Sequence, residues 1–138
     1  MLNRVALLLC ISILCMNIMG CNNKKYMNFE GYYSNQQKFD AVATFFRFYP
    51  DGTVTASLPV TVNHVIAFKP NQLDKDNSKE CTIRGKYTLN GNKVKFKLVD
   101  KNGSADFSGE FRENKVILTS HNNINGRDSE ETFDFYHW

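Results

Sequence analysis

Short runs of alternating apolar and polar residues fill the chain from Phe29 to its end. In the clearest run, Lys93 to Val99, the residues Val94, Phe96 and Leu98 alternate with lysines. A period of two places the apolar side chains on one face of a β-strand and the lysines on the other. We therefore predict a strand with one buried and one wet face, as in an antiparallel sheet.

Turn residues separate these runs. Asp51-Gly52 and Asn90-Gly91-Asn92 stand between alternating segments, and Gly tolerates the positive φ that tight hairpins require. Polar loops are expected at 69–79 and 121–129. The predicted strands are 29–33, 41–49, 53–58, 60–68, 81–89, 93–99, 107–112, 115–120 and 131–136.

The pattern predicts an all-β fold. No helical periodicity follows residue 21, and short strands joined mostly by tight turns favour a meander that closes on itself, because closure removes exposed edges. We expect a small antiparallel up-and-down barrel of about 8 strands, formed as one domain by residues 29–138.

Aromatic residues are expected to fill this barrel. An eight-stranded barrel has an interior just wide enough for its own side chains, so a packed core is one outcome. The other is an apolar cavity beside the loops at 69–79 or 121–129. The expected core phenylalanines are Phe46, Phe48, Phe96, Phe107, Phe111, Phe133 and Phe135.

The N-terminal segment has a different character. Arg4 is followed by an apolar run from Val5 to Ile13, and Gly20 directly precedes Cys21, which is the layout of a secretory signal with its cleavage point. A transmembrane helix and a plain secretory signal are the alternatives. A spanning helix needs about 20 mostly apolar residues, and polar residues interrupt this segment.

Ile18-Met19-Gly20-Cys21 resembles the lipobox of bacterial lipoproteins, with Met19 as an unusual member. The resemblance implies a lipoprotein signal peptide at 1–20, acylation of Cys21 with fatty chains such as palmitate, and a lipidated tether at 21–28. Several acyl chains anchor a protein stably, at about 0.8 kcal/mol per buried methylene. Asn22 stands where enteric inner-membrane lipoproteins have Asp, so the implied location is the bacterial cell envelope, at the outer membrane.

A second resemblance concerns the domain itself. Gly31-Tyr32-Tyr33 resembles the Gly-x-Trp opening of lipocalins, with Tyr33 in the place of the tryptophan. The segments 48–54, 85–92 and 107–111 are similar to small bacterial lipoproteins with a lipocalin-like β-barrel domain. This resemblance spans about 29–136 and implies a binding module for an apolar or amphipathic ligand. Trp138, the only tryptophan, lies at the opposite end from the lipocalin position.

The charge excludes some partners. The net charge is +3 at pH 7, and Arg4 leaves with the signal peptide. Mixed charges and a nearly neutral domain argue against nucleic acid. Arg84, Lys86 and the lysines at 93, 95 and 97 form either a basic face for lipid phosphates or acidic glycans, or an ordinary solvated face.

No catalytic constellation is evident. Cys10 and Cys15 leave with the signal and Cys21 is acylated, so Cys81 has no disulfide partner and is expected to be a small buried hydrophobe. The histidines are scattered in sequence, and acidic pairs such as Glu130 and Glu131 are expected in polar loops, without ligand spacing. We expect no enzyme activity, cofactor or metal.

Two classes of function remain open. The first is a membrane-anchored binding module for an apolar or amphipathic ligand. The second is an accessory protein with a filled barrel that contacts an envelope protein through exposed aromatics such as Phe45, Tyr49 or Tyr136.

Overall fold

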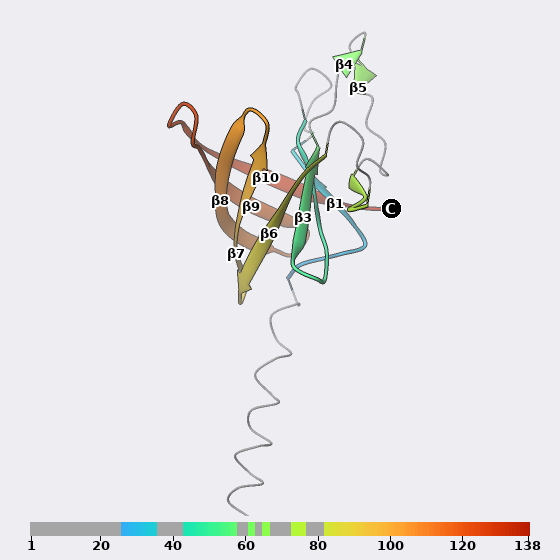
Figure 1. Ribbon diagram of the computed structural model, residues 1–138. Coiled ribbons are helices and arrows are strands. Elements are labelled where there is room, and N and C mark those ends of the chain that lie inside the picture. The colour runs from blue at the N-terminus through green and yellow to red at the C-terminus, as the bar shows by residue number, and fades with distance from the viewer. Residues whose placement is uncertain (1–25, 36–42, 58–60, 63–64, 67–72, 77–81) are drawn as a thin grey trace, which may run out of the picture.

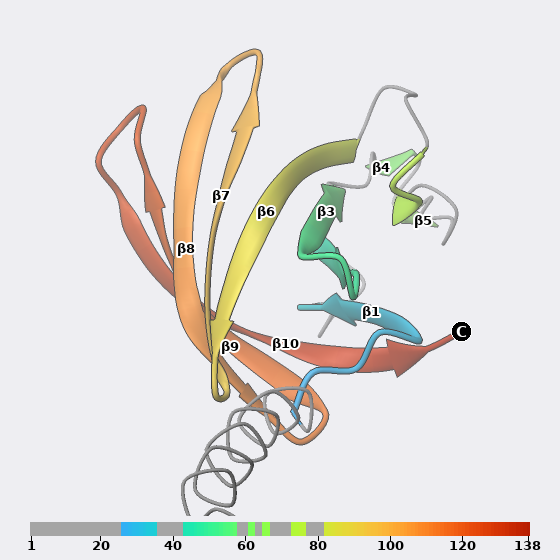
Figure 2. The same cartoon turned by 60° about the horizontal axis from the view of Figure 1, so that its bottom comes forward.

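A computed structural model describes residues 26–35, 43–57, 61–62, 65–66, 73–76 and 82–138. Eight of its strands close into one antiparallel barrel (Figures 1 and 2), which confirms the predicted all-β class. The barrel strands are β1 (Gly31–Ser34), β2 (Phe45–Phe48), β3 (Thr53–Ser57), β6 (Thr82–Asn90), β7 (Lys93–Asp100), β8 (Gly103–Arg112), β9 (Lys115–Asn122) and β10 (Asp128–His137).

The barrel is an up-and-down meander. Around it the order is β1-β10-β9-β8-β7-β6-β3-β2, so the barrel strands lie beside their sequence neighbours and β1 closes the barrel against β10. Gly31 pairs with His137 and Ser34 with Asp134 at this closure. Each of the eight strands therefore has a partner on both sides, which leaves no exposed edge in the barrel.

The two ends of the barrel differ. At one end, here called the turn end, tight turns join β2 to β3, β6 to β7 and β8 to β9. Gly52 and Gly91 in these turns have φ values of 81° and 63°, the conformation that the Asp-Gly and Asn-Gly signals predict. At the other, here called the loop end, lie the β7–β8 turn and the β9–β10 loop at 123–127. Figure 1 shows these ends at the bottom and the top of the barrel.

The interior at the turn end is solid. Tyr33 is fully buried, and its ring meets Phe48 and Phe111 edge-on with centroids 5.8 and 5.4 Å apart. Met27 packs into the same cluster and is 5% exposed, although we assigned it to the tether. The Asn28 amide also donates a hydrogen bond to the Tyr33 hydroxyl at 3.0 Å, so the packed domain begins before Phe29.

Some predicted segments were wrong in detail, including the strand predicted at 107–112, which begins at Gly103. Residues 60–68 do not form one strand, because β4 (Thr61–Val62) and β5 (Val65–Ile66) pair with each other in a separate two-stranded sheet. The predicted loop at 121–129 is shorter, since β9 runs on to Asn122 and β10 already begins at Asp128. Both strands therefore extend the barrel wall further toward the loop end than the sequence suggested.

A second apolar cluster lies outside the barrel. Phe45 faces outward from β2 and is fully buried beneath Leu73 and Ala43. The Leu73 carbonyl accepts hydrogen bonds from the hydroxyls of Tyr49 and Thr55, the latter at 2.8 Å. The expected exposure of Phe45 and Tyr49 was therefore wrong. Of the three aromatics expected on a contact surface, only Tyr136 is exposed, at 38%.

Several predictions lie outside the described residues. These are the signal peptide at 1–20, the acylation site Cys21, the thiol of Cys81 and the imidazole of His64. Among the residues that the structure covers, no helix is long and apolar enough to cross a membrane.

Candidate functional site: a cavity at the loop end of the barrel

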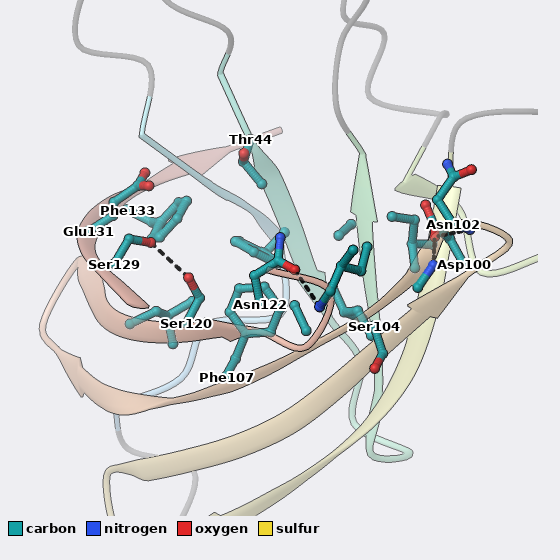
Figure 3. Close-up of a pocket in the computed structure, with 18 residues that line it drawn as sticks. Thr44, Asp100, Asn102, Ser104, Phe107, Ser120, Asn122, Ser129, Glu131 and Phe133 are labelled. Atoms are coloured by element: carbon teal, nitrogen blue, oxygen red, sulfur yellow. Dashed lines mark hydrogen bonds between the residues drawn. The ribbon is translucent and has the colours of Figure 1, made fainter. Parts of the chain in front are cut away.

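The barrel is hollow toward the loop end. A cavity of about 420 Å³ lies there, inside the range of about 300–1,000 Å³ that small-molecule sites occupy. Figure 3 shows the side chains around it. A cavity beside the loop predicted at 121–129 was one of the two outcomes left open by the sequence, and the structure shows it.

The cavity exists because inward-facing positions change in size along the strands. Toward the turn end they carry rings such as Phe48 and Phe111, whereas near the loop end they carry Ala105, Ser120 and Ser129. Register places Ala105 opposite Leu98 on β7 and Ser120 opposite Ser129 on β10. Small side chains on adjacent walls leave space that large ones would fill.

Aromatic rings form the floor of the cavity. Phe46 lies 4.9 Å from Phe133 and 5.6 Å from Phe107, centroid to centroid, and both contacts are edge-on. Phe107 also stacks on Phe96 at 4.7 Å. These phenylalanines were predicted core residues, and they separate the hollow half of the barrel from the filled half. A ligand in the cavity would rest on an apolar, close-packed surface.

Apolar side chains also form part of the cavity wall. Ala56, Ile83, Leu98 and Leu118 line it from β3, β6, β7 and β9. Ile124, in the β9–β10 loop, joins them at the loop end although it is 65% exposed. Placing an apolar group against these side chains would remove both surfaces from water, at about 25 cal/mol per Å².

Polar side chains surround the loop end of the cavity. The hydroxyls of Ser120 and Ser129 are 2.8 Å apart across β9 and β10, as Figure 3 shows. The Asn122 side-chain oxygen accepts a hydrogen bond from the Ile124 amide at 2.9 Å. Asp100 accepts hydrogen bonds from the amides of residues 102 and 103, which fixes the β7–β8 turn. The cavity is thus apolar inside and polar at its rim.

Sequence reasoning gave Glu131 two placements, in a polar loop together with Glu130 and as the first residue of the strand predicted at 131–136. The strand is correct and the loop is wrong, because Glu131 occupies an inward position of β10 opposite Leu118. Its carboxylate accepts a hydrogen bond from the Asn35 side chain, while the Asn35 oxygen accepts one from the Thr44 amide at 2.7 Å. Glu130 faces away from the cavity. In the sequence, the spacing of two between Ser129, Glu131 and Phe133 indicates that Glu131 shares the inward face of the strand with Phe133.

The basic side chains predicted to share a face lie on the outer surface of the barrel. Lys93, Lys95 and Lys97 are exposed on the outside of β7, with Arg84 and Lys86 exposed on β6. Acidic side chains on β8 interrupt the charge, since Lys97 pairs with Asp106 at 3.7 Å. Hydrogen bonding by Asn123, with Lys97 nearby, lowers the pKa of Asp106.

The described histidines lie far apart and do not form a common site. His121 pairs with Asp128 at 2.6 Å at the loop end, whereas His137 lies 3.9 Å from Glu30 near the turn end. Within the described part of the chain, no three metal-ligating side chains gather to hold an ion. Burial raises the pKa of Tyr33 to about 12, which fits a neutral core hydroxyl.

The fold and the cavity together define the class: a small closed antiparallel β-barrel, filled at one end and hollow at the other. No family model, curated protein or solved structure matches the chain.

Proposed function

We propose that this chain is a lipid-anchored binding module of the bacterial cell envelope, which holds an apolar or amphipathic ligand in its barrel. The cavity carries the proposal. It combines an aromatic floor, aliphatic walls and a polar rim, and this is the usual composition of small-molecule sites. The lipocalin-like segments in the sequence support the same function by analogy.

The lipobox-like sequence supports the anchor, and the fold is compatible with it. Four residues, 22–25, separate Cys21 from Tyr26, where the described residues begin, and the five Cα–Cα steps between them span at most about 18 Å. The domain is entered at the turn end, since Met27 packs beside Tyr33 in the filled half. Acylation of Cys21 would therefore keep the filled half next to the membrane and leave the loop end free to receive a ligand.

The alternative, an accessory protein that contacts an envelope partner, has less support. It required a filled interior and a continuous outer apolar patch. Phe45 and Tyr49 belong instead to the covered outer cluster, and the interior is hollow at the loop end. The exposed rings of Tyr136 and Trp138 favour a partner surface, but Tyr32 already packs against both, with centroids 5.4 Å from each.

The test is to identify what the cavity holds in its host. A form beginning at Asn22 keeps every residue that packs in the described barrel, so it can be purified without detergent. Mass spectrometry of small molecules that co-purify should find an amphiphile in the unaltered barrel and in Ser108→Phe, which adds a ring to the outer face. Ala105→Phe, which fills the cavity, should lose it. An amphiphile retained equally by both variants would contradict the proposal.

A further inference from the structure

The charged side chains that line the cavity in the described part of the chain are all acidic. Asp100 and Glu131 are the only charged side chains among the described residues that line it. Figure 3 shows them on opposite sides of the cavity, with Ser120, Ser129 and Asn122 between. A ligand whose apolar body rests on the phenylalanine floor would bring its polar head into this acidic rim.

The described basic side chains of the neighbouring strands and turns lie outside the cavity lining. Lys97 points outward from β7 and pairs with Asp106. Lys101 and Arg127 are exposed in the β7–β8 turn and the β9–β10 loop, and neither lines the cavity. An anionic head at the rim would therefore meet two carboxylates with no described lysine, arginine or histidine among the lining side chains. A cationic head would meet two opposite charges.

Glu131 is the better placed of the two carboxylates. It lies directly between Ser129 and the floor residue Phe133 along the inner face of β10. The Asn35 side chain donates a hydrogen bond to one of its oxygens and so holds the carboxylate in place. Asp100 is less available, because its Oδ1 already accepts the amides of Asn102 and Gly103 at 2.7 and 3.0 Å.

We infer that the cavity selects an amphiphile with a positively charged head, an alkylammonium in chemical class, whose cation contacts Glu131. The inference rests on the proposed function and deepens it. Opposite charges within a few ångströms attract, and the neighbouring protein surface lowers the dielectric constant around them. The same carboxylates disfavour fatty acids, since a third anionic carboxylate at the rim would be repelled by these two.

The test compares amphiphiles that share one alkyl chain and differ only in the charge of the head group. The fluorescent probe N-phenyl-1-naphthylamine is bound to the form that begins at Asn22, and dodecylammonium, dodecanol and dodecanoate are titrated as competitors below their micellar concentrations. We expect dodecylammonium to displace the probe at the lowest concentration and dodecanoate at the highest. If dodecanoate competes as well as dodecylammonium, the charge inference is wrong.

Two adjacent glutamates give a matched pair of variants. Glu131→Gln should lower the affinity for dodecylammonium about fivefold, which is the contribution of a partly exposed ion pair, and leave the affinity for dodecanol unchanged. Glu130→Gln removes the same charge from the outer face and should change neither. Equal effects of the two variants would overturn the role of Glu131. If Glu131→Gln fails to fold, Asp100→Asn tests the acidic rim instead. This variant should bind dodecylammonium more weakly, and an unchanged affinity would contradict the inference.

The outcomes separate the inference from the function. A probe that does not bind the unaltered barrel, with no competitor effect, contradicts the binding module itself. If the probe binds and all three amphiphiles displace it equally, the binding-module proposal is supported and the inference of charge selection is wrong.

Discussion

At the scale of single residues, Gly31 occupies a position in β1 where there is no room for a side chain. A Cβ at this position would lie 2.1 Å from the Tyr136 carbonyl oxygen and 2.6 Å from the Phe135 ring. Real atoms do not approach so closely, so any larger residue must push β1 away from β10. The glycine in Gly31-Tyr32-Tyr33 thus has a steric role at the barrel closure.

Gly31→Ala should lower the free energy of unfolding by about 1–3 kcal/mol, the usual cost of overpacking. Urea denaturation measures it. Gly91→Ala serves as the comparison, because its Cβ would meet nothing within 4 Å and the strain comes only from the φ of 63°. Its loss should be smaller, about 1 kcal/mol. An unchanged midpoint for Gly31→Ala would contradict the close approach.

Asp51 is the carboxylate with the strongest shift among the exposed residues of the turn end. Hydrogen bonds from Thr53, first from its backbone amide at 3.0 Å, and from Lys75 at 3.2 Å lower the pKa of Asp51 to about 2. The folded state therefore favours the ionised form. That contribution is complete above the ordinary pKa of 3.8 and is lost as the pH falls toward 2.

Asp51→Asn keeps a side-chain oxygen for the Thr53 amide but removes the charge. The difference in unfolding free energy between the unaltered protein and this variant should shrink as the pH falls from above 3.8 to about 2. Chemical denaturation at a series of pH values measures it. A difference that stays constant across this range would show that the Asp51 charge does not stabilise the fold.

At the scale of elements, the sequence predicted the barrel strands well because one rule governs them. The strict alternation of residues 93–99 predicted β7 and its buried face, and Gly91 predicted the hairpin turn that precedes this strand. The ends of β9 and β10 were missed because their inward residues near the loop end are polar. Asn122 and Ser129 face the cavity instead of a packed core, so the sequence pattern placed them in a loop.

The outer cluster was beyond the reach of periodicity. The outward positions Thr55 and Ser57 carry polar side chains, yet both are buried, and the Thr55 hydroxyl donates a hydrogen bond to the Leu73 carbonyl. Leu73 lies in a polar segment whose position over β2 depends on contacts distant in sequence. Alternation identifies which residues share a face, but it does not show what covers that face.

Leu73→Ala should therefore destabilise the protein although Leu73 lies outside the barrel. The side chain is fully buried against Phe45, so its loss should cost about 2–3 kcal/mol. Val99→Ala, at an outer position that is 59% exposed, should change stability by less than about 0.5 kcal/mol. Thermal or urea unfolding compares the two. Equal effects would show that the outer cluster adds nothing to stability.

At the scale of the whole molecule, the proposed anchor and the cavity lie at opposite ends. A tether that enters beside Met27 meets the filled half, while the rim with Glu131 and Asp100 lies at the loop end. This arrangement suits a protein that collects a ligand from the aqueous side of its membrane. It depends on acylation of Cys21, for which the sequence is the support.

Cys21→Ser should abolish acylation and leave an uncleaved precursor, because an oxygen replaces the sulfur that carries the lipid. Metabolic labelling with a fatty acid analogue, followed by gel analysis, reads both results at once. Cys81→Ser is the matched control and should be labelled like the unaltered protein. Labelling that survives Cys21→Ser would remove the anchor from the proposed function.

The central claim is that the hollow half of the barrel binds an apolar molecule. Titration of the form that begins at Asn22 with N-phenyl-1-naphthylamine tests it directly. A saturable rise in fluorescence at one probe per protein is expected, lost in Ala105→Phe and kept in Ser108→Phe, with both variants folded by circular dichroism. No saturable rise, or equal binding by Ala105→Phe, would contradict the claim.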